Sequence, residues 1–372
     1  MIDIKVLHIC SYYYGTKLYK NLMNNLSKDN LDFTVFAPCS YNARYDGNED
    51  YLVQAKCFNK LDRLIFHYKY NKVYNALMEK IKVDKYDILH AHSLFANGYI
   101  AYKVFKEYHI PYIVAVRNTD INTFFKYFIH LRKLGLKILE NASKIILISN
   151  AYKDKILKYI PEEKRKAIID KCSVIPNGID KFFLENRGEP KKLKDGKLDL
   201  VFTGRIDNNK NLCTTIKCCD KLLKHEYNVK LTVMGTIASK KYNKIIKKCD
   251  FINYLGQKSK EEMKEIYKSM DIFVMPSKHE TFGLVYVEAM SQGLPVIYTR
   301  NEGFDQFFED GEVGYSMKYD DYKEMQYNIK HIISNYNQIS KNCIEKSIEF
   351  NWSEIAKKYI ELYKKISHEG KK

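Results

Sequence analysis

The chain has 372 residues, of which 45% are hydrophobic, so its length and composition allow two domains of ordinary size. It contains no run of 18 apolar residues and no basic, cleavable leader at its start, which argues against a transmembrane helix and a signal peptide. The net charge of +17 makes nucleic acid, anionic lipid and phosphorylated substrates candidate partners, with a lysine-rich solvated surface as the alternative.

Short apolar runs alternate with helical patterns in the first half of the chain. Strands are expected at Lys5–Ile9, Phe33–Ala37, Ile88–His90, Tyr112–Val116, Lys144–Ile148 and Ser173–Ile175. Helices are expected at Lys17–Leu26, Ala96–Tyr108, Asn122–Lys137 and Asn150–Lys158. This alternation predicts parallel βαβ units, so residues 1–185 are expected to form one doubly wound domain.

A polar stretch containing Gly188 and Pro190 follows, and residues 186–197 are the predicted linker, the alternative being a long loop within one domain. Further strands are expected at Asp199–Thr203, Lys230–Met234, Phe251–Asn253, Ile272–Met275, Pro295–Tyr298 and Val313–Tyr315. Helices are expected at Leu212–Lys224, Lys260–Lys268, Gly283–Ser291, Tyr322–Asn335, 338–349 and 353–367. Residues 198–350 should form a second doubly wound domain, and residues 351–372 a helix that could pack back on the first. The predicted fold is α/β, with two such domains facing each other across a cleft.

Two carboxylates, Glu280 and Glu288, lie eight residues apart around Gly283. Glu288 is the only charged residue between Phe282 and Met290, and burying a carboxylate costs several kcal/mol unless it is hydrogen-bonded. A pair of ligand hydroxyls could supply those hydrogen bonds, whereas the alternative is a core helix in which Glu288 pairs with a basic neighbour. The amides around Gly283 would begin the helix and could hold an anion.

Basic residues follow the first strand of the second half. Gly204 allows a sharp turn, after which Arg205 and Lys210 can reach one anion together. With the amides near Gly283, this arrangement suits a diphosphate. The alternative is two exposed basic residues in a loop.

Taken together, several motifs resemble glycosyltransferase family 4, the retaining group with a GT-B fold that is also called glycosyl transferases group 1. The resemblance covers most of the chain and is most specific from about residue 172 to residue 315. The motifs are Gly204-Arg205 with Lys210-Asn211, Pro276-Ser277-x-x-Glu280-x-Phe282-Gly283, Glu288-Ala289-Met290, Gly293-x-Pro295-Val296-Ile297, Pro176-Asn177-Gly178-Ile179-Asp180 and Asp87-Ile88-Leu89-His90-Ala91-His92.

The resemblance implies roles for these residues. Arg205 and Lys210 would bind the donor diphosphate and stabilise charge on the leaving group. Glu288 would accept hydrogen bonds from two ribose hydroxyls, and Glu280 would contact the donor sugar. Backbone groups of the donor site would come from Phe282, Gly283 and Leu284 on one side and from Leu255 and Gly256 beside the nucleobase. No covalent catalyst is assigned, since retaining members are thought to need none.

Nothing in the sequence points to a metal or another cofactor. The chain contains no Asp-x-Asp pair of the kind that holds a nucleotide diphosphate through a divalent ion. Its nine cysteines include no Cys-x-x-Cys pair, which fits a reducing cytoplasm and argues against a structural zinc site. His90 and His92 have no third ligand at a suggestive spacing, so a metal site is not expected there. The resemblance implies that His92 is a cleft residue, and a core position is at least as good an interpretation of His90.

Two segments depart from the family pattern. The loop after the first strand carries only Gly15 and several tyrosines where a double glycine is usual. Arg117, three residues before Asp120, occupies the place of a common histidine. Both segments are expected to face the donor or the acceptor. The alternative for Arg117 is an ion pair with Asp120.

The resemblance implies that the first domain binds the acceptor, often a lipid-linked sugar, and part of this domain is basic and aromatic. Residues 58–144 carry 15 Lys/Arg against 7 Asp/Glu, an excess of +8, and they interleave aromatic residues with cations. Such segments can lie on anionic membranes, although ordinary amphipathic core helices are the alternative. No recognised nucleic-acid module is visible, so nucleic acid is not an expected partner.

The sequence therefore predicts a metal-independent, retaining enzyme that moves a sugar from a nucleotide donor, expected to be UDP-linked, to a saccharide or lipid-linked acceptor. The expected setting is the assembly of cell-surface polysaccharide in the cytoplasm or peripherally at the inner face of the membrane. The rival interpretations are a nucleotide-sugar epimerase of the same fold and a catalytically silent partner of a transferase.

Overall fold

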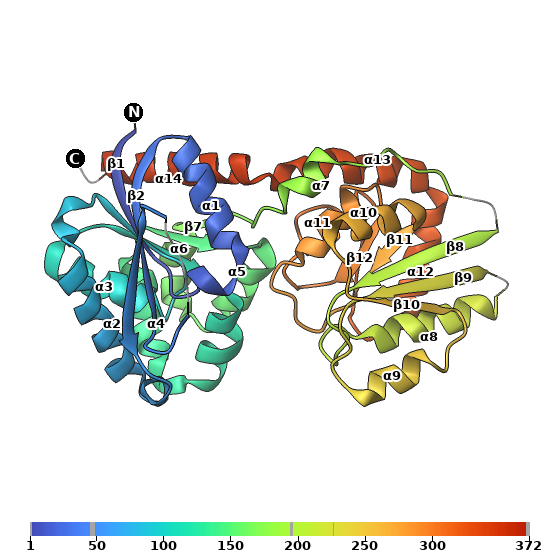
Figure 1. The fold of residues 1–372 in the computed structure, drawn as a ribbon, viewed down its shortest axis with the longest axis horizontal. Coiled ribbons are helices and arrows are strands. Elements are labelled where there is room, and N and C mark those ends of the chain that lie inside the picture. The colour runs from blue at the N-terminus through green and yellow to red at the C-terminus, as the bar shows by residue number, and fades with distance from the viewer. Residues whose placement is uncertain (1, 45–48, 194–195, 226, 370–372) are drawn as a thin grey trace. The chain divides into compact units, whose positions relative to one another are not determined.

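The computed structural model describes residues 2–44, 49–193, 196–225 and 227–369. These residues form two compact units, each considered separately below (Figure 1). The first contains the described residues up to Ile148, Lys153–Pro176 and the described residues from Trp352 onward. The second contains Ser149–Tyr152 and the described residues of Asn177–Asn351. The chain passes from the first unit to the second after Pro176, whereas the predicted linker was residues 186–197.

The first unit is built on a seven-stranded sheet in the order β3-β2-β1-β4-β5-β6-β7, and every strand pairing in its described part is parallel. The strands are β1 (Ile2–Ile9), β2 (Leu31–Ser40), β3 (Leu52–Phe58), β4 (Ile88–Ala91), β5 (Tyr112–Val116), β6 (Lys144–Leu147) and β7 (Cys172–Val174). β4 and β5 are buried along their whole length, because helices cover both faces of a parallel sheet. The strand order reverses between β1 and β4, which makes their carboxyl ends the expected ligand-binding edge.

Helices of the first unit form two groups that cover this sheet (Figure 1). The α-helices are α1 (Lys17–Lys28), α2 (Phe66–Lys80), α3 (Gly98–Tyr108), α4 (Arg132–Asn141), α6 (Glu162–Ile169) and α14 (Trp352–Glu369), and α5 (Asn150–Leu157) follows β6 in the chain. The short helical turns are η1 (Tyr13–Gly15), η2 (Leu61–Leu64), η3 (Val83–Lys85), η4 (Asp120–Phe125) and η5 (Ile129–Leu131). α14 packs against α1 through a buried stripe that includes Ile355, Tyr359 and Tyr363, whose spacing is that of one helix face.

The second unit is built on a six-stranded sheet in the order β10-β9-β8-β11-β12-β13, again with parallel pairings in its described part. Its strands are β8 (Lys197–Thr203), β9 (Asn228–Met234), β10 (Ile252–Gly256), β11 (Ile272–Val274), β12 (Val296–Thr299) and β13 (Gly314–Met317). Its helices are α7 (Lys181–Glu185), α8 (Leu212–Leu223), α9 (Lys240–Ile246), α10 (Lys260–Ser269), α11 (Leu284–Met290), α12 (Tyr322–Ser334), α13 (Tyr336–Ser347) and the turn η6 (Ile348–Phe350). Here the order reverses between β8 and β11.

The residues of the predicted linker that precede β8 pack against the second unit. The amide of Gly188 donates to the carbonyl of Ser291 at 2.9 Å. The ammonium of Lys191 donates to the carbonyls of Tyr267 and Met270 at 2.5 and 2.8 Å, and a cation at this end of α10 also complements the helix dipole. Lys194 and Asp195 of the predicted linker lie outside the described residues.

Besides short helical turns, five elements were not predicted, namely β3, α2, α6, α7 and α9, and one predicted helix is broken. β3, α6 and α9 are short and carry charges, so their patterns are weak. The predicted helix 122–137 is instead η4, η5 and α4, with the break before Arg132. Gly135 in α4 packs so closely that a Cβ there would lie 2.7 Å from a ring carbon of Phe95. Among the described residues, no helix is both long enough and apolar enough to cross a membrane.

Candidate functional site

The loops after β8 and β11 form the centre of the candidate site in the second unit. These strands are neighbours at the point where the strand order reverses, so their carboxyl ends open onto the same edge. The amide of Lys278 donates to the carbonyl of Asn209 at 2.7 Å, and the side chain of Asn209 donates to the carbonyl of His279 at 2.9 Å. The two loops are therefore held together by hydrogen bonds.

Lys210 and Glu280 form an ion pair across these loops, and most of each side chain is buried. The Glu280 carboxylate also accepts from the hydroxyl of Ser277 at 3.2 Å and from the amide of Thr281 at 3.1 Å. Its own amide donates to Glu302 at 2.8 Å. Glu280 is thus fixed from several sides, and Lys210 is positioned by it.

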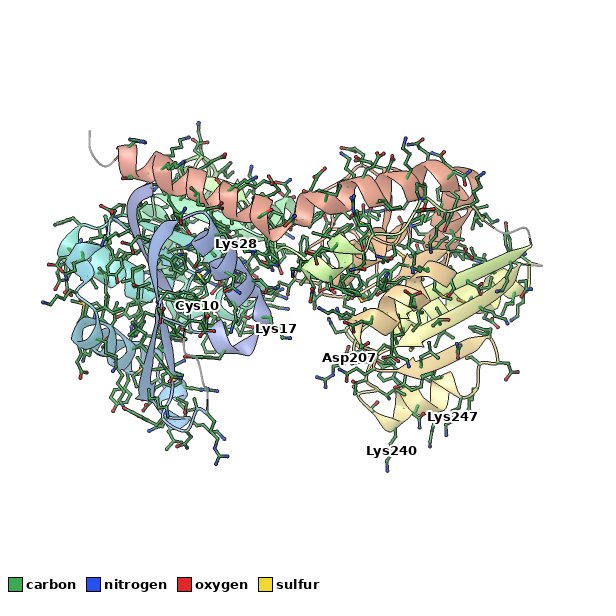
Figure 2. All side chains as sticks on the ribbon, turned by 45° about the horizontal axis from the view of Figure 1, so that its top comes forward. Cys10, Lys17, Lys28, Asp207, Lys240 and Lys247 are labelled. Carbon is green, nitrogen blue, oxygen red and sulfur yellow. The ribbon has the colours of Figure 1, made fainter. Side chains whose placement is uncertain are left out.

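Asp207, marked in Figure 2, shapes the loop that carries the two cations. Its carboxylate accepts from the amides of Asn209 and Lys210, both at 2.9 Å, which is an Asx turn. The same carboxylate lies 3.6 Å from Nε of Arg205, whose side chain is 72% exposed. The sequence interpretation missed Asp207, although an aspartate three residues before Lys210 is a typical turn signal.

Gly204 lies where β8 ends and adopts a φ of +155°. Its carbonyl is approached so closely by Gly235 that a Cβ on Gly235 would lie 1.9 Å from it. A Cβ on Gly204 itself would lie 3.4 Å from the sulfur of Met275 and 3.7 Å from the side chain of Lys210. The pair of glycines therefore lets two loops approach each other beside Lys210.

Glu288 lies half-buried on α11, and burial raises the pKa of its carboxyl to about 7, with the charge of Asp180 adding to the shift. Among the described residues no lysine, arginine or histidine forms an ion pair with it, so the alternative of a structural ion pair is wrong. Asp180 itself is paired with Lys260 at 3.1 Å. Burying Glu288 without a cationic partner therefore costs free energy, as expected of a group that binds a ligand.

The start of α11 has the backbone shape that was predicted. Gly283 is its N-cap at φ +81°, and a Cβ there would lie 2.3 Å from the ring of Tyr286. The first helical hydrogen bond runs from the amide of Tyr286 to the carbonyl of Gly283, so the amides of Gly283 and Leu284 precede it. The ring of Phe282 is buried against Phe304, Phe307 and Phe350, which leaves its backbone rather than its side chain available.

Leu255 and Gly256 end β10 at the same edge of the sheet. Gly256 adopts a φ of +71°, and its carbonyl accepts from the amide of Gly235 at 2.7 Å. These two residues are thereby linked to the glycine that packs on Gly204. The second unit brings together the predicted residues of its loops, namely Gly204, Arg205, Lys210, Glu280, Phe282, Gly283, Leu255 and Gly256.

Four predicted site residues belong to the first unit, namely Gly15, His92, Arg117 and Asp120. The Asp120 carboxylate is buried and accepts from the amides of Leu94 at 3.0 Å, Phe95 at 3.1 Å and Arg117 at 2.8 Å. Burial raises its pKa to about 6, while these amides oppose the shift. A Cβ on Gly15 would meet nothing within 4 Å, so this glycine is not required by close backbone approach.

Arg117 does not form the expected alternative, a side-chain ion pair with Asp120. Its Nε donates to the carbonyl of His92 at 3.2 Å, and its guanidinium is hydrogen-bonded to Tyr359 of α14. Its contact with Asp120 is made by the backbone amide. Arg117 is thus held between the loop after β4 and the terminal helix.

His90 and His92 have a third histidine beside them that the sequence spacing did not reveal. His8 on β1 is buried with both, and its Nδ1 lies 3.0 Å from Nε2 of His92, while Nδ1 of His90 lies 2.6 Å from the hydroxyl of Tyr363. Ring nitrogens of the three lie within 4.8 Å of one another, so the cluster has a composition that could hold a metal. Burial lowers the pKa of all three, that of His8 to about 3, so the rings are neutral at pH 7.

Comparison with known protein families covers both halves of the chain. The Glycosyltransferase Family 4 model matches residues 16–181, and the Glycosyl transferases group 1 model matches residues 185–350. An uncharacterized protein in the cps region of Klebsiella pneumoniae is 26% identical over 97% of this chain and 99% of its own length. An uncharacterized glycosyltransferase of Methanocaldococcus jannaschii is 27% identical over 99% and 100%. The alpha-monoglucosyldiacylglycerol synthase of Acholeplasma laidlawii is 28% identical over 65% of each chain.

Solved structures share the fold. A sucrose-phosphate synthase from Thermosynechococcus elongatus superposes with a TM-score of 0.75 at 16% identity, over 98% of this chain and 99% of its own. HepE of Anabaena, in complex with UDP and glucose, superposes with a TM-score of 0.67 at 16% identity, over 98% and 100%. With the two family models in tandem and these neighbours over 98% of its length, the chain belongs to the glycosyltransferases of GT-B fold that join a Family 4 domain to a group 1 domain.

Proposed function

We propose that this glycosyltransferase retains the configuration of the sugar and takes it from a UDP-linked donor without a metal ion. The observation that carries the proposal is Glu288, a half-buried carboxylate without a cationic partner, which suits two ribose hydroxyls. Arg205 and Lys210 at the edge of the same sheet suit a diphosphate. UDP as the nucleotide is supported by HepE, which was solved with UDP and glucose.

In the proposed reaction the acceptor hydroxyl forms a bond to the anomeric carbon on the face from which the diphosphate leaves. The bond from that carbon to the diphosphate oxygen breaks, and the acceptor proton passes to a phosphate oxygen of the leaving group. Lys210 and Arg205 would stabilise the growing negative charge, which is electrostatic catalysis by fixed cations. Glu280 would contact the donor sugar, and its bonds to Ser277 and Thr281 keep it in place.

The acceptor is proposed to be a saccharide or a lipid-linked sugar in the assembly of cell-surface polysaccharide. Support comes from the relative in the Klebsiella pneumoniae cps region and from the relative named as a glycolipid synthase. We assign the acceptor to the first unit, as the resemblance implies. A membrane-bound acceptor is favoured because large apolar residues in and beside η2 and in the segment after η4 are exposed.

Incubating the purified chain with a panel of nucleotide sugars tests the proposed reaction. We expect UDP release from one donor, and the rate should be unchanged by EDTA, because two side-chain cations take the place of a metal. Loss of activity in EDTA that added Mg²⁺ restores would contradict metal independence. A new sugar isomer without nucleotide release would indicate epimerisation, and no reaction with any donor would indicate a silent partner.

Peripheral docking to an anionic membrane is tested by liposome co-sedimentation. We expect stronger binding to vesicles containing anionic phospholipid than to neutral vesicles, with the preference falling as salt is raised. Replacing both Leu64 and Ile65, which are 81% and 63% exposed, with serine should weaken binding, because their burial in lipid is favourable. The exposed Leu223 of the second unit, replaced with serine, is the matched control. Equal sedimentation with neutral and anionic vesicles would refute the docking.

A further inference from the structure

A pocket of about 390 Å³ opens at the carboxyl edge of the first sheet. β1 ends just before Cys10, which is marked in Figure 2, and the next two residues, Ser11 and Tyr12, line the pocket. Ala96 lines it from the loop after β4, the strand beside β1 at which the strand order reverses. The rest of the lining is Phe58, Arg63, Leu64, Phe66, Lys69, Tyr70, Phe124, Phe128, His130 and Leu131. The pocket therefore occupies the position where open parallel sheets bind ligands.

The walls of the pocket are aromatic rings that fix one another. Phe66 lies 4.6 Å from Tyr70 and 6.0 Å from Phe124, measured between ring centroids. Phe124 stacks on the buried ring of Phe95 at 4.7 Å and contacts Phe128 at 5.4 Å. Because these rings are packed on the core, the walls are rigid.

Two cations of the pocket lack a carboxylate partner. The ammonium of Lys69 lies 4.4 Å from the ring centroid of Phe58 and 3.3 Å from the hydroxyl of Tyr70, and the guanidinium of Arg63 lies 5.9 Å from the same Phe58 ring. Among the described residues neither cation forms an ion pair with a carboxylate. Asp62 is the acidic group nearest to them in sequence, but Lys72 holds it at 3.0 Å.

The positive charge of the pocket is therefore only partly compensated, because Asp62, whose charge raises the pKa of Lys69, is already paired with Lys72. Burial lowers the pKa of Lys69 to about 8, and the charge of Arg63 lowers it further in the same direction. An anion placed between the two side chains would relieve this repulsion and would favour the charged form of Lys69. Arg63 offers a planar fork of donors and Lys69 a point charge, a combination suited to a phosphate.

The rim of the pocket is apolar and exposed. Leu64 and Phe128 line the pocket and are 81% and 41% exposed. Beside them lie further exposed apolar residues, namely Leu61, Ile65, Tyr127 and Ile129. An acceptor with a phosphate at one end of an apolar chain complements both features, since the phosphate meets the cations and the chain meets the rim.

We propose that this pocket binds the phosphate group of a lipid-linked acceptor, with Lys69 and Arg63 as its ligands and the exposed rim of η2 and the segment after η4 as the contact for the lipid chain. The proposal rests on the proposed function, in which the first unit binds the acceptor. It names the chemical class of that acceptor and the residues that select it. The surrounding rings would also provide faces for the sugar attached to the phosphate.

Binding of farnesyl diphosphate to the whole chain, measured by isothermal titration with saturating UDP present, tests this site. Wild-type protein should bind farnesyl diphosphate at least about tenfold more tightly than farnesol or inorganic pyrophosphate, because only the first offers both an anion and a chain. Lys69→Met should weaken that binding about tenfold or more, and Arg63→Gln by a smaller factor. Lys103→Met is the matched control, because Lys103 also lies over a ring, 3.9 Å from the centroid of Tyr74, but does not line the pocket.

Several outcomes would overturn the assignment. Equal binding of farnesol and farnesyl diphosphate would show that the phosphate is not recognised. Unchanged binding by both Lys69→Met and Arg63→Gln would show that these residues are not its ligands. Arg63 is exposed, so its variant remains informative if Lys69→Met fails to fold. In a second titration that begins without UDP, displacement of bound farnesyl diphosphate by UDP would show that the lipid phosphate occupies the nucleotide site instead. UDP binding without farnesyl diphosphate binding would refute this pocket alone, and the reverse would refute the proposed donor.

Discussion

Glu288→Gln is expected to weaken UDP binding about a hundredfold at pH 8, because two hydrogen bonds to a charged acceptor become weaker bonds to a neutral one. The wild-type affinity should also depend on pH. The pKa of Glu288 is raised to about 7, so the carboxylate that accepts the ribose hydroxyls is mostly lost at pH 6. UDP affinity should therefore fall about tenfold from pH 8 to pH 6 in the wild type and should stay nearly flat in the variant. Isothermal titration across this range measures both effects.

The same substitution should raise thermal stability, which separates a ligand-binding carboxylate from a structural one. The folded pKa lies above the ordinary value of 4.5, so the folded state binds the proton more tightly than the unfolded chain does. The contribution of Glu288 to the free energy of unfolding is fully present below the unfolded pKa, where the carboxyl is protonated. It is lost as the pH rises through the folded pKa near 7, because a charged carboxylate is then buried. Glu288→Gln should thus melt higher than wild type at pH 8, and the difference should vanish near pH 4.

Glu265→Gln is the matched control, because Glu265 is an exposed carboxylate of α10 in the same unit. It should leave UDP affinity and its pH dependence unchanged. A Glu288→Gln variant that melts lower than wild type and binds UDP normally would contradict the assignment of Glu288 to the ribose.

Lys210→Met is expected to lower kcat by about 10²–10³ with a smaller change in KM, since a fixed cation acts mainly on charge that develops in the transition state. Glu280→Gln should also slow turnover more than it weakens donor binding, because its place is near the donor sugar. The two side chains form one partly buried pair, so their effects should not add. Steady-state kinetics of both single variants and the double variant measure this coupling.

Lys278→Met provides the control for Lys210, because Lys278 lies in the same pair of loops and contacts Asn208 rather than Glu280. Its kcat should remain close to that of wild type. Equal losses of kcat in the Lys210 and Lys278 variants would indicate a general effect of charge. An unchanged kcat in the Lys210 variant would contradict a catalytic role for Lys210.

The sequence predicted most of the fold because both units consist of parallel βαβ repeats with strongly apolar strands. β5 and β11 are examples, since every residue in them is buried. The linker was predicted at residues 186–197 because this stretch is polar. The structure instead packs the part after Asn186 on α10 and Ser291 of the second unit. β3 was missed because it is an edge strand that exposes Lys56, so its alternation is weak.

The candidate site could be predicted where its residues are close in the chain. The turn at Gly204 and the start of α11 at Gly283 need conformations that favour glycine, and such signals are local. Glu302 was missed because it reaches the amide of Glu280 from 22 residues away. Asp207 was overlooked although its turn with Asn209 and Lys210 is a local signal. Arg117 was placed near its neighbour Asp120, but its side chain meets Tyr359 of α14 instead.

Spacing along the chain by itself determined the alternating elements, the two cations and the two carboxylates of the donor loops, and with them the resemblance to the family. Only the tertiary structure decided which side chains are paired. It paired Lys210 with Glu280 and left Glu288 without a cationic partner. It also placed His8 beside His90 and His92, which are 82 and 84 residues away in the chain. The physical reason is that backbone conformation follows local sterics and periodicity, whereas the charge state and partners of a side chain follow burial and contacts between distant strands.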